Sequence, residues 1–418
     1  MLTIRKIRVA SGDTAAARRA ARYVLAPSEA PGPVARALDA LRGLPTTGDP
    51  PPNSRWLGSE TMLDRLGVRR GAAVEQRELA LALQGRNAQG GARLRVEGLI
   101  EREVSDERGH PVYDGSGRRV TERVRGTKCV DLTFSAPKSV SVLWSQAPPQ
   151  LRTEIEGAML DAADAMLATM TQTKAVVAHG GRLHPAIGFA AAAALHVMAR
   201  ATKADPVPAP QLHVHAIVVG VERADGFFAG PELSSMFKGG APLEGGAVAR
   251  AKVAERLVEL DFEVDHRGRF FEVRGVPAGL IERMSARTRD VDARLGERER
   301  AKGAPLTNRE RAVAALETRL PKGAEAPPER VAEAWTAWAA EHSFGPDDVV
   351  GSRIGQGFEE TLADRLTTVM AAVGARLGKA RSEGDQRATV FECAAGRLRL
   401  SEALPRLDDL LATGRLPT

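Results

Sequence analysis

The sequence has few cysteines and no long apolar run, and each shortage excludes a class of protein. Only two of its 418 residues are cysteines, Cys129 and Cys393, too few for a disulfide framework or a zinc site of four thiolates. The longest uncharged apolar run, 186–199, contains a histidine and is shorter than the roughly 18–20 residues that span a membrane. Charges alternate through residues 1–10, where a secretion signal would be apolar. We therefore expect a soluble, cytoplasmic protein without membrane insertion.

Aromatic residues are also scarce, yet enough apolar material is present for a large core. Aromatic residues make up 4% of the chain and hydrophobic residues 43%, so small side chains must fill much of the interior. The length is sufficient for two or three domains. Lys and Arg number 59 against 53 Asp and Glu, a net charge of +6 that is compatible with a polyanionic partner such as nucleic acid.

Hydrophobic periodicity predicts a mixture of strands and helices, an α+β protein. Alternation of apolar and polar residues favours strands, and spacing of 3.6 residues favours helices. The clearest predictions are strands over 2–9, 130–134, 187–197 and 211–221, and helices over 151–173, 247–260 and most of the chain after 277. Turn residues within 95–128 predict a basic β arm. The Pro, Gly and Thr residues of 26–55 predict a loop inserted in the fold.

Three histidines are candidate metal ligands. His213 and His215 alternate along a predicted strand, so they project from the same face about 7 Å apart and can share one ion. His196 lies in the preceding β segment, and the connection between the segments is long enough for the strands to pair. A site of three histidines leaves coordination positions open for substrate oxygen. The alternative is that these histidines are solvated or hydrogen-bonded groups on a sheet face.

Asp131 and Tyr23 are the other candidates for chemistry. Asp131 interrupts an apolar strand, where a carboxylate is costly unless it is paired, so it either orients a metal-binding histidine or binds an arginine. Tyr23, one of two tyrosines, follows Arg18, Arg19 and Arg22, whose charges would attract phosphate and stabilise a phenolate. A phenolic oxygen that attacks phosphorus would form a covalent phosphotyrosine. The alternative is that Tyr23 only packs one face of a helix.

Two runs of sequence carry a resemblance to a known family. The run from Asp131 to Ser141 reads DLTFSAPKSVS, and it is followed by His196 and then by PQLHVH at 210–215. This order resembles the relaxase domain of the conjugative TrwC/TraI-like (MobF) proteins, which are HUH endonucleases. The resemblance extends over about residues 1–345, and Tyr23 in Ala20-Ala21-Arg22-Tyr23 stands where the family has its first catalytic tyrosine.

The resemblance implies a fold and a domain organisation. The expected fold is a central antiparallel β-sheet flanked by helices, with a C-terminal helical region. Residues 1–276 would form the catalytic domain, which includes the inserted loop 26–55 and the β arm 95–128. Residues 277–345 would form a helical extension that closes over single-stranded DNA, and 346–418 a helical C-terminal segment.

The resemblance also implies an activity, the nicking and rejoining of one DNA strand at an origin of transfer through a 5′-phosphotyrosyl intermediate. By residue-for-residue transfer, His196, His213 and His215 would hold a divalent ion (Mg, Mn or Zn). Tyr23 would be the nucleophile, and Asp131 the orienting residue and base. The residues expected to neutralise DNA phosphates are Arg22, Arg125 and Lys138.

The expected partners follow from the same resemblance. They are single-stranded DNA and a hairpin at the origin of transfer, accessory relaxosome proteins and a type IV secretion coupling protein, in the bacterial cytoplasm.

The chain departs from the family in three ways. It has one N-terminal tyrosine where relatives often have pairs, its connection between His196 and His213 is longer and richer in Pro, and it lacks the Gly-x-x-x-x-Gly-Lys-Ser/Thr run of an ATP-driven helicase.

Other functions stay open at the level of sequence. A rolling-circle replication initiator would use the same chemistry at a replication origin, but the block from Asp131 to Ser141 is associated with relaxases. A non-catalytic DNA-binding protein would bind DNA without forming an adduct. A metal-dependent hydrolase would use water in place of Tyr23 and leave DNA ends that carry no protein.

Overall fold

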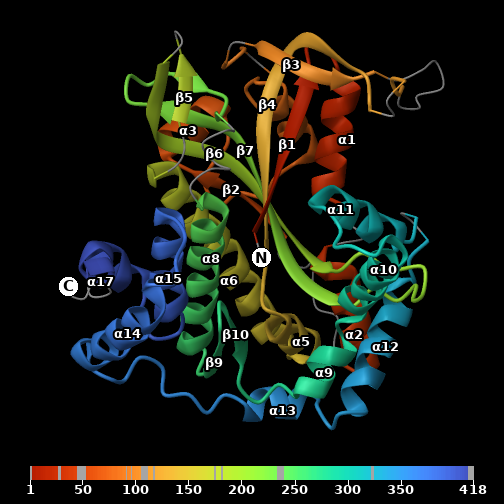
Figure 1. Ribbon diagram of the computed structural model, residues 1–418, viewed down its shortest axis with the longest axis vertical. Helices are drawn as coiled ribbons and strands as arrows, with labels where there is room; N and C mark the ends of the chain where they lie inside the picture. The colour runs from red at the N-terminus through yellow and green to blue at the C-terminus, as the bar shows by residue number, and fades with distance from the viewer. Residues whose placement is uncertain are drawn as a thin grey trace.

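A computed structural model of the chain centres on one antiparallel sheet (Figure 1). The described residues are 2–26, 30–44, 53–90, 92–95, 97–104, 112–115, 118–173, 176–179, 182–232, 240–321 and 324–412. The strands of this sheet are β1 (Leu2–Ala10), β2 (Ser54–Gly58), β3 (Gly98–Glu103), β4 (Thr121–Ser135), β5 (Val176–His179), β6 (Arg182–Met198), β7 (Pro210–Arg223) and β8 (Phe228–Ala229). Their order is β1-β4-β7-β6-β2, with β3, β5 and β8 paired at the margins. The predicted α+β fold is confirmed.

Helices cover both faces of the sheet and create two cores. On one face, the first core is built with α5 (Lys138–Gln146), α6 (Pro149–Thr173) and α8 (Ala241–Glu259). On the other face, the second core is built with α1 (Thr14–Val24), α3 (Glu60–Leu66) and α4 (Gln76–Leu83). The two cores share the sheet, so each central strand is buried on both sides.

The alanine run of β6 is a strand although alanine favours helices. Ala191 and Ala193 belong to the first core, whereas Ala190, Ala192 and Ala194 belong to the second, and all five are fully buried. Both neighbouring strands, β2 and β7, bond to this run. Small side chains allow helices to pack closely on both faces, and this tertiary packing overrides the intrinsic preference of alanine.

The segment 26–55 is not a loop throughout, so that prediction was wrong for part of it. Residues Pro31–Leu41 form α2, in which Val34 and Leu38 are buried, and α2 packs against α12 (Pro328–Ala340). Pro31 is tolerated because the first residues of a helix have no intrahelical partner for their N–H groups. Ser54 begins β2. Residues 27–29 and 45–52 lie outside the described residues.

β3 and β4 form the predicted β arm. β3 pairs with residues 121–126 of β4, where most side chains are exposed, and β4 becomes buried from Gly126 onward as it enters the sheet. The arm is at the top of Figure 1. Residues 96, 105–111 and 116–117 of the predicted range lie outside the described residues.

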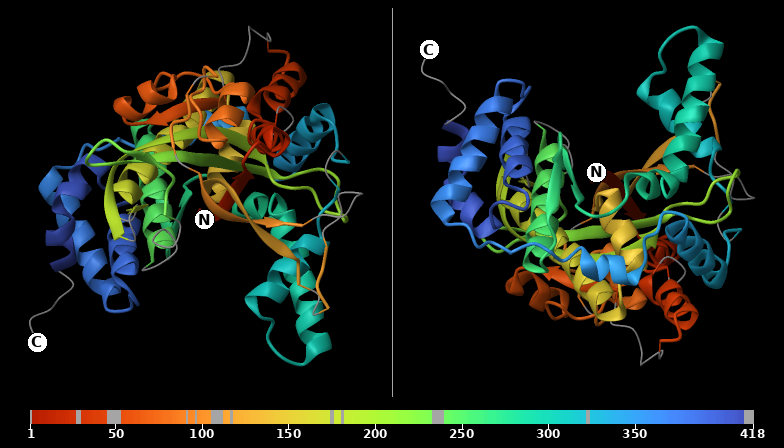
Figure 2. Two further views of the ribbon diagram at one scale, coloured as in Figure 1. Left: turned by 90° about the horizontal axis from the view of Figure 1, so that it is seen from above. Right: turned by 90° about the horizontal axis from the view of Figure 1, so that it is seen from below.

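The helices that follow residue 277 lie in two groups on opposite sides of the molecule (Figure 2). One group is α9 (Ala278–Arg283), α10 (Ala286–Lys302), α11 (Asn308–Glu317) and α12, of which α10 and α11 project from the body. The hairpin of β9 (Val264–Arg267) and β10 (Phe270–Val273) precedes them, and α13 (Pro346–Gly351) follows. The other group is α14 (Leu362–Leu377), α15 (Glu383–Ala394), α16 (Leu400–Ala403), a short 3-10 turn (Leu404–Arg406) and α17 (Leu407–Ala412). No helix among the described residues has the length and apolar character needed to cross a membrane.

Two buried carboxylates of α8, Glu244 and Glu255, accept hydrogen bonds from the C-terminal group. Arg387 on α15 donates to Glu244 at 2.6 Å, and the Leu400 amide donates to Glu255 at 2.7 Å. Apolar residues of α14, α15 and α17 belong to the first core. Residues 346–412 therefore pack as part of the same folded body as the sheet.

Candidate active site

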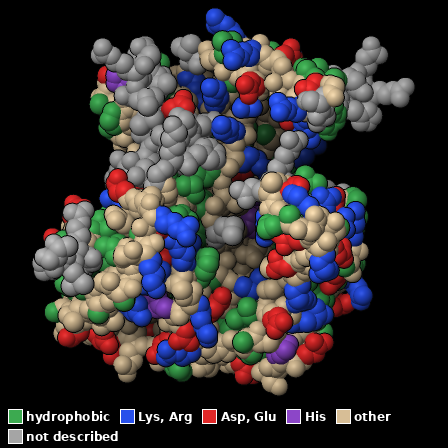
Figure 3. Space-filling model, viewed as in Figure 1, with side chains coloured by type: hydrophobic (Ala, Val, Ile, Leu, Met, Phe, Trp, Pro, Cys, Tyr) green, Lys and Arg blue, Asp and Glu red, His purple; other side chains and the backbone are tan. Residues whose placement is uncertain are grey.

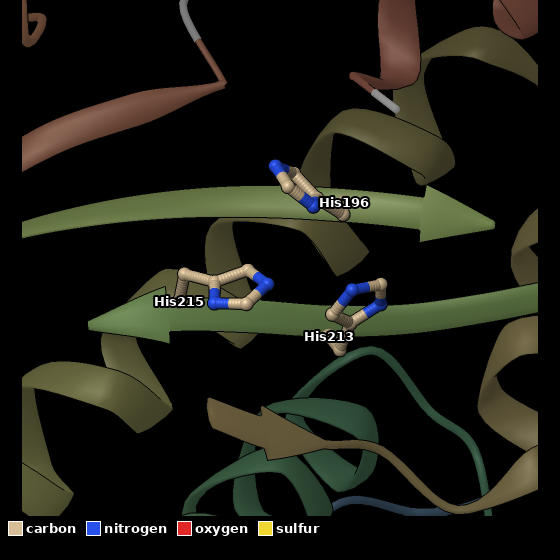
Figure 4. A group of neighbouring side chains, drawn as sticks. All are labelled: His196, His213 and His215. Atoms are coloured by element: carbon tan, nitrogen blue, oxygen red, sulfur yellow. The ribbon is translucent and has the colours of Figure 1, made fainter. Parts of the chain in front are cut away.

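Three histidines come together on one face of the sheet, on its two central strands (Figure 4). His196 of β6 is directly opposite His213 of β7, and His215 lies two residues further along β7. Their ring centroids are separated by 5.2 Å (His196 and His213), 4.9 Å (His196 and His215) and 5.4 Å (His213 and His215). One ligand atom from each ring lies within 4.8 Å of the others. The predicted metal ligands thus form a cluster.

The cluster continues the face of the sheet that carries the second core. Along β6, His196 follows Ala190, Ala192 and Ala194 on that face, because side chains alternate with a period of two. Along β7, His213 and His215 lie on the same face as Ile217 and Val219, closer to the start of the strand. The same packing that buries the alanines therefore directs all three imidazoles to one place.

Each imidazole has one ring nitrogen within hydrogen-bond distance of a carbonyl or carboxylate oxygen. The bonds run from His196 Nε2 to the Val24 carbonyl (2.7 Å), from His213 Nδ1 to the Gln211 carbonyl (2.9 Å) and from His215 Nδ1 to the Asp131 carboxylate (2.9 Å). In a neutral imidazole the other nitrogen then holds the lone pair. This is how metal-binding histidines are commonly oriented, so the three residues fit a divalent ion.

Asp131 lies beneath His215 and is 3% exposed. Both of its carboxylate oxygens are within 3.0 Å of His215 Nδ1, and Oδ1 also accepts from the Thr133 hydroxyl at 3.0 Å. Of the two roles considered from sequence, contact with a histidine is the one that the geometry supports. Thr133, 3.2 Å from the same nitrogen, was missed, although its place two residues after Asp131 puts it on the same face.

Tyr23 is in the last turn of α1, beside the histidines. Its ring meets that of His215 edge to face, with centroids 5.8 Å apart. Asp13 caps the start of α1, and Ala17, Ala21 and Val24 bury its apolar face in the second core. Because the Val24 carbonyl accepts from His196, the end of α1 is tied to β6. The fold therefore brings Tyr23, predicted as the nucleophile, next to the histidine cluster.

A cavity of about 960 Å³ opens beside Tyr23 and His213. The molecule is hollowed next to α10 and α11, with Lys and Arg side chains along the hollow (Figure 3). The basic residues that line the cavity are Lys138, Arg5, Arg200, Arg287 and Arg319. The four arginines were missed because they come from separate stretches of chain and belong to no motif.

The three predicted DNA contacts lie in different places. Lys138 lines the cavity, donates to the Pro210 carbonyl at 2.8 Å, and has its pKa lowered to about 8 by burial, which the nearby Glu272 partly opposes. Arg22 is exposed on α1, and Arg125 is exposed on the β arm. Neither of these arginines lines the cavity.

The proline-rich connection between β6 and β7 is anchored. The Ala199 amide donates to Ala209 across the connection at 2.9 Å. Trp335 of α12 donates to the Pro208 carbonyl at 2.9 Å, and the Ala326 amide donates to Pro206 at 3.0 Å. The connection is therefore held by hydrogen bonds between its own ends and to the helical extension.

A family model described as TrwC relaxase matches residues 46–342. The chain belongs to the TrwC relaxase family. The matched region contains Asp131 and the three histidines, whereas Tyr23 precedes it. The resemblance inferred from the two sequence runs is confirmed at the level of the family.

Solved structures of the conjugative relaxase TrwC share the fold. A metal-bound complex with oriT DNA is 20% identical with a TM-score of 0.56, and a metal-free complex is 21% identical with a TM-score of 0.54. A complex with a 27-mer DNA that comprises the recognition hairpin and the cleavage site is 22% identical, with a TM-score of 0.54. Each comparison covers 82% of this chain and 99% of the other. No curated protein matches the sequence.

Proposed function

We propose that this member of the TrwC relaxase family is a conjugative relaxase, a metal-dependent enzyme that nicks and rejoins one DNA strand at an origin of transfer. The observation that carries the proposal is the contact between His215 and Tyr23, whose side chain also lines a basic cavity. A nucleophile, three potential metal ligands and a phosphate-attracting surface meet there. Family membership and the TrwC complexes with oriT DNA support the same activity.

The reaction we propose is a transesterification at phosphorus. The Tyr23 oxygen forms a bond to the scissile phosphate, the bond from phosphorus to the 3′ oxygen breaks, and the DNA is left with a free 3′ hydroxyl and a 5′-phosphotyrosyl link. The phosphodiester bond is replaced by another phosphoester, so the reverse reaction rejoins the strand without ATP. We propose that one tyrosine serves both steps, because Tyr23 lines the cavity and Tyr113, the other tyrosine of the sequence, does not.

The remaining residues would prepare the phosphate for attack. A divalent ion (Mg, Mn or Zn) bound by His196, His213 and His215 would withdraw charge from the non-bridging oxygens. Asp131 would hold His215 in the tautomer that exposes its Nε2 lone pair, a role supported by their 2.9 Å hydrogen bond. Its further role as base for the phenol proton rests on the resemblance alone.

The DNA and protein partners are proposed on the same basis. Single-stranded DNA would occupy the cavity, and a hairpin from the origin of transfer would lie nearby. Accessory relaxosome proteins and a type IV secretion coupling protein would act with the enzyme in the bacterial cytoplasm. The proposed division is a catalytic domain at 1–276, an extension at 277–345 that closes over the strand, and a C-terminal segment at 346–418.

The competing functions differ in their products. A rolling-circle initiator would form the same adduct at a replication origin, and membership of a relaxase family favours the origin of transfer. A non-catalytic binder would shift DNA without an adduct. A hydrolase that uses water would cut DNA in a Tyr23→Phe variant as well as the wild type does.

The deciding experiment uses overlapping single-stranded oligonucleotides that cover the DNA flanking the gene, with magnesium or manganese. Denaturing gels detect protein joined covalently to DNA. We expect an adduct from the wild type and from Tyr113→Phe, the matched control, but none from Tyr23→Phe. An adduct that persists in Tyr23→Phe, or cleavage without any adduct, would overturn the proposal.

A further inference from the structure

Four arginines from four separate segments of the chain gather in the cavity beside Tyr23. Arg5 lies on β1, Arg200 at the start of the connection between β6 and β7, Arg287 in the first turn of α10, and Arg319 just after α11. Among the described residues that line the cavity, Glu325 alone is acidic, and it pairs with Arg200 at 3.2 Å. The cavity therefore carries a clear excess of fixed positive charge.

These guanidinium groups are close enough to repel one another. Burial lowers the pKa of Arg319, as do the charges of Arg200 and Arg5. Burial also lowers the pKa of Arg287, as do Arg319 and Arg200, and Asp290 only partly opposes this. Asp290 in turn accepts a hydrogen bond from the Thr202 hydroxyl. Such an arrangement is unfavourable in the free protein, and an anion in the cavity would relieve it.

The backbone holds the cluster in place. Thr202 and Arg319 form a β bridge, and the flanking hydrogen bonds run from Lys203 N to Thr318 O (2.9 Å) and from Leu320 N to Ala201 O (3.1 Å). The Arg287 guanidinium also donates to the Arg200 carbonyl at 3.4 Å. The helical extension is thus docked on the connection that separates His196 from His213, and the two arginines of the extension are fixed relative to the histidines.

The cluster also lies beside the reacting groups. Arg5 is the cross-strand neighbour of Asp131, so both side chains project from the same face of the sheet. Arg319 and Tyr23 line the same cavity, and the charge of a Tyr23 phenolate would raise the pKa of Arg319. At about 960 Å³ the cavity is large enough for more than one nucleotide.

We propose that Arg5, Arg200, Arg287 and Arg319 form a phosphate clamp that holds single-stranded DNA across the cavity and positions one phosphodiester at Tyr23. The proposal rests on the proposed relaxase function and extends it to four named positioning residues. Guanidinium groups suit this task because they bind phosphate oxygens with two parallel hydrogen bonds. Arg287 and Arg319 also give the helical extension a direct part in the reaction.

Salt-dependent DNA binding tests the clamp separately from catalysis. The probe is a fluorescent oligothymidylate of about 15 nucleotides, titrated in EDTA over a range of salt concentrations. The variants are Arg287→Ala/Arg319→Ala, Arg287→Lys/Arg319→Lys, and the control Arg330→Ala, whose side chain is 72% exposed on α12. Thermal melting establishes that each variant is folded.

We expect the double alanine variant to bind at least about 10-fold more weakly at low salt. Its slope of log K against log salt should fall by about 1.4, since each phosphate contact on a single strand contributes about 0.7. The lysine variant should keep the slope, because its charges remain, and lose part of the affinity. The control should match the wild type.

Three outcomes separate the clamp from the nickase. A folded double alanine variant with wild-type affinity and slope would overturn the clamp. The predicted loss of slope together with a Tyr23 adduct from the wild type supports both proposals. The same loss of slope in a protein that forms no adduct supports the binding of single-stranded DNA by the clamp and overturns both the nicking activity and the positioning of a phosphodiester for it.

Discussion

The histidine site on the sheet and the arginine wall of the cavity are built in different ways. The site, here called the floor, consists of Asp131 and the three histidines, which three adjacent strands direct to one face, and its member His213 lines the cavity. The wall consists of Arg200, Arg287 and Arg319, which come from the connection between β6 and β7, from α10 and from the residues after α11. The floor depends on strand register, whereas the wall depends on docking of the helical extension. The comparison suggests that chemistry resides in the floor and DNA affinity in the wall.

The change with the largest expected effect on this comparison is His213→Ala. It removes one of three predicted metal ligands, so cleavage should fall by at least about 100-fold. His213 is only partly buried, and the melting temperature should change little. Cleavage rate and thermal melting are measured on the same preparation. Full activity in this variant would show that cleavage does not depend on the histidine site.

Asp131→Asn should have the next largest effect. The amide keeps the shape of the side chain but removes the charge that orients His215, so metal affinity should fall by about 10- to 100-fold. Thr133→Val should have a smaller effect because it leaves the carboxylate in place. Metal titration monitored by calorimetry gives both values, and equal losses in the two variants would argue against a special role for the carboxylate.

DNA binding in the cavity should depend on pH through Lys138, which lines the cavity together with the arginine wall. The pKa of this lysine is lowered to about 8 by burial, so the side chain is charged below that pH and neutral above it. Raising the pH through about 8 should therefore weaken DNA binding, although bound phosphate shifts the loss to higher pH. Binding of single-stranded DNA at several pH values, compared with a folded Lys138→Arg variant, measures this. An identical pH dependence in both proteins would exclude Lys138 as the cause.

The smallest effect on activity is expected from Gly126→Ala, at the junction of the arm and the sheet. A Cβ at Gly126 would lie 2.3 Å from the Val9 carbonyl, so the β1–β4 ladder must shift, at about 1–3 kcal/mol of unfolding free energy. Gly98, its partner in the β3–β4 ladder, has open space at that position, which makes Gly98→Ala the matched control. Equal melting temperatures for the two variants would contradict this packing.

The contrast between floor and wall also explains what the sequence could predict. His213 and His215 alternate within one strand, and Asp131 interrupts an apolar strand, so a local pattern identified each of them. Arg287 and Arg319 lie in a highly charged part of the chain in which no arginine stands out. The bridge between Thr202 and Arg319 and the hydrogen bond from Arg287 to the Arg200 carbonyl place them at the cavity.

Local pattern failed in a similar way for α2. The segment 26–55 is rich in Pro and Gly, which favour turns, and it was predicted as a loop. Contact between α2 and α12 stabilises a helix there, and its prolines lie in the first turn, where they are tolerated. The partner in this packing is almost 300 residues away, so no local signal could reveal it.

The central claim is that Tyr23 itself becomes joined to DNA. Mass spectrometry of the tryptic peptides, after reaction with origin DNA and nuclease digestion, locates the modified residue directly. We predict a nucleotide attached through phosphate to Tyr23, with Tyr113 unmodified. Cleaved DNA with no nucleotide on Tyr23, or with the nucleotide on another residue, would contradict the account.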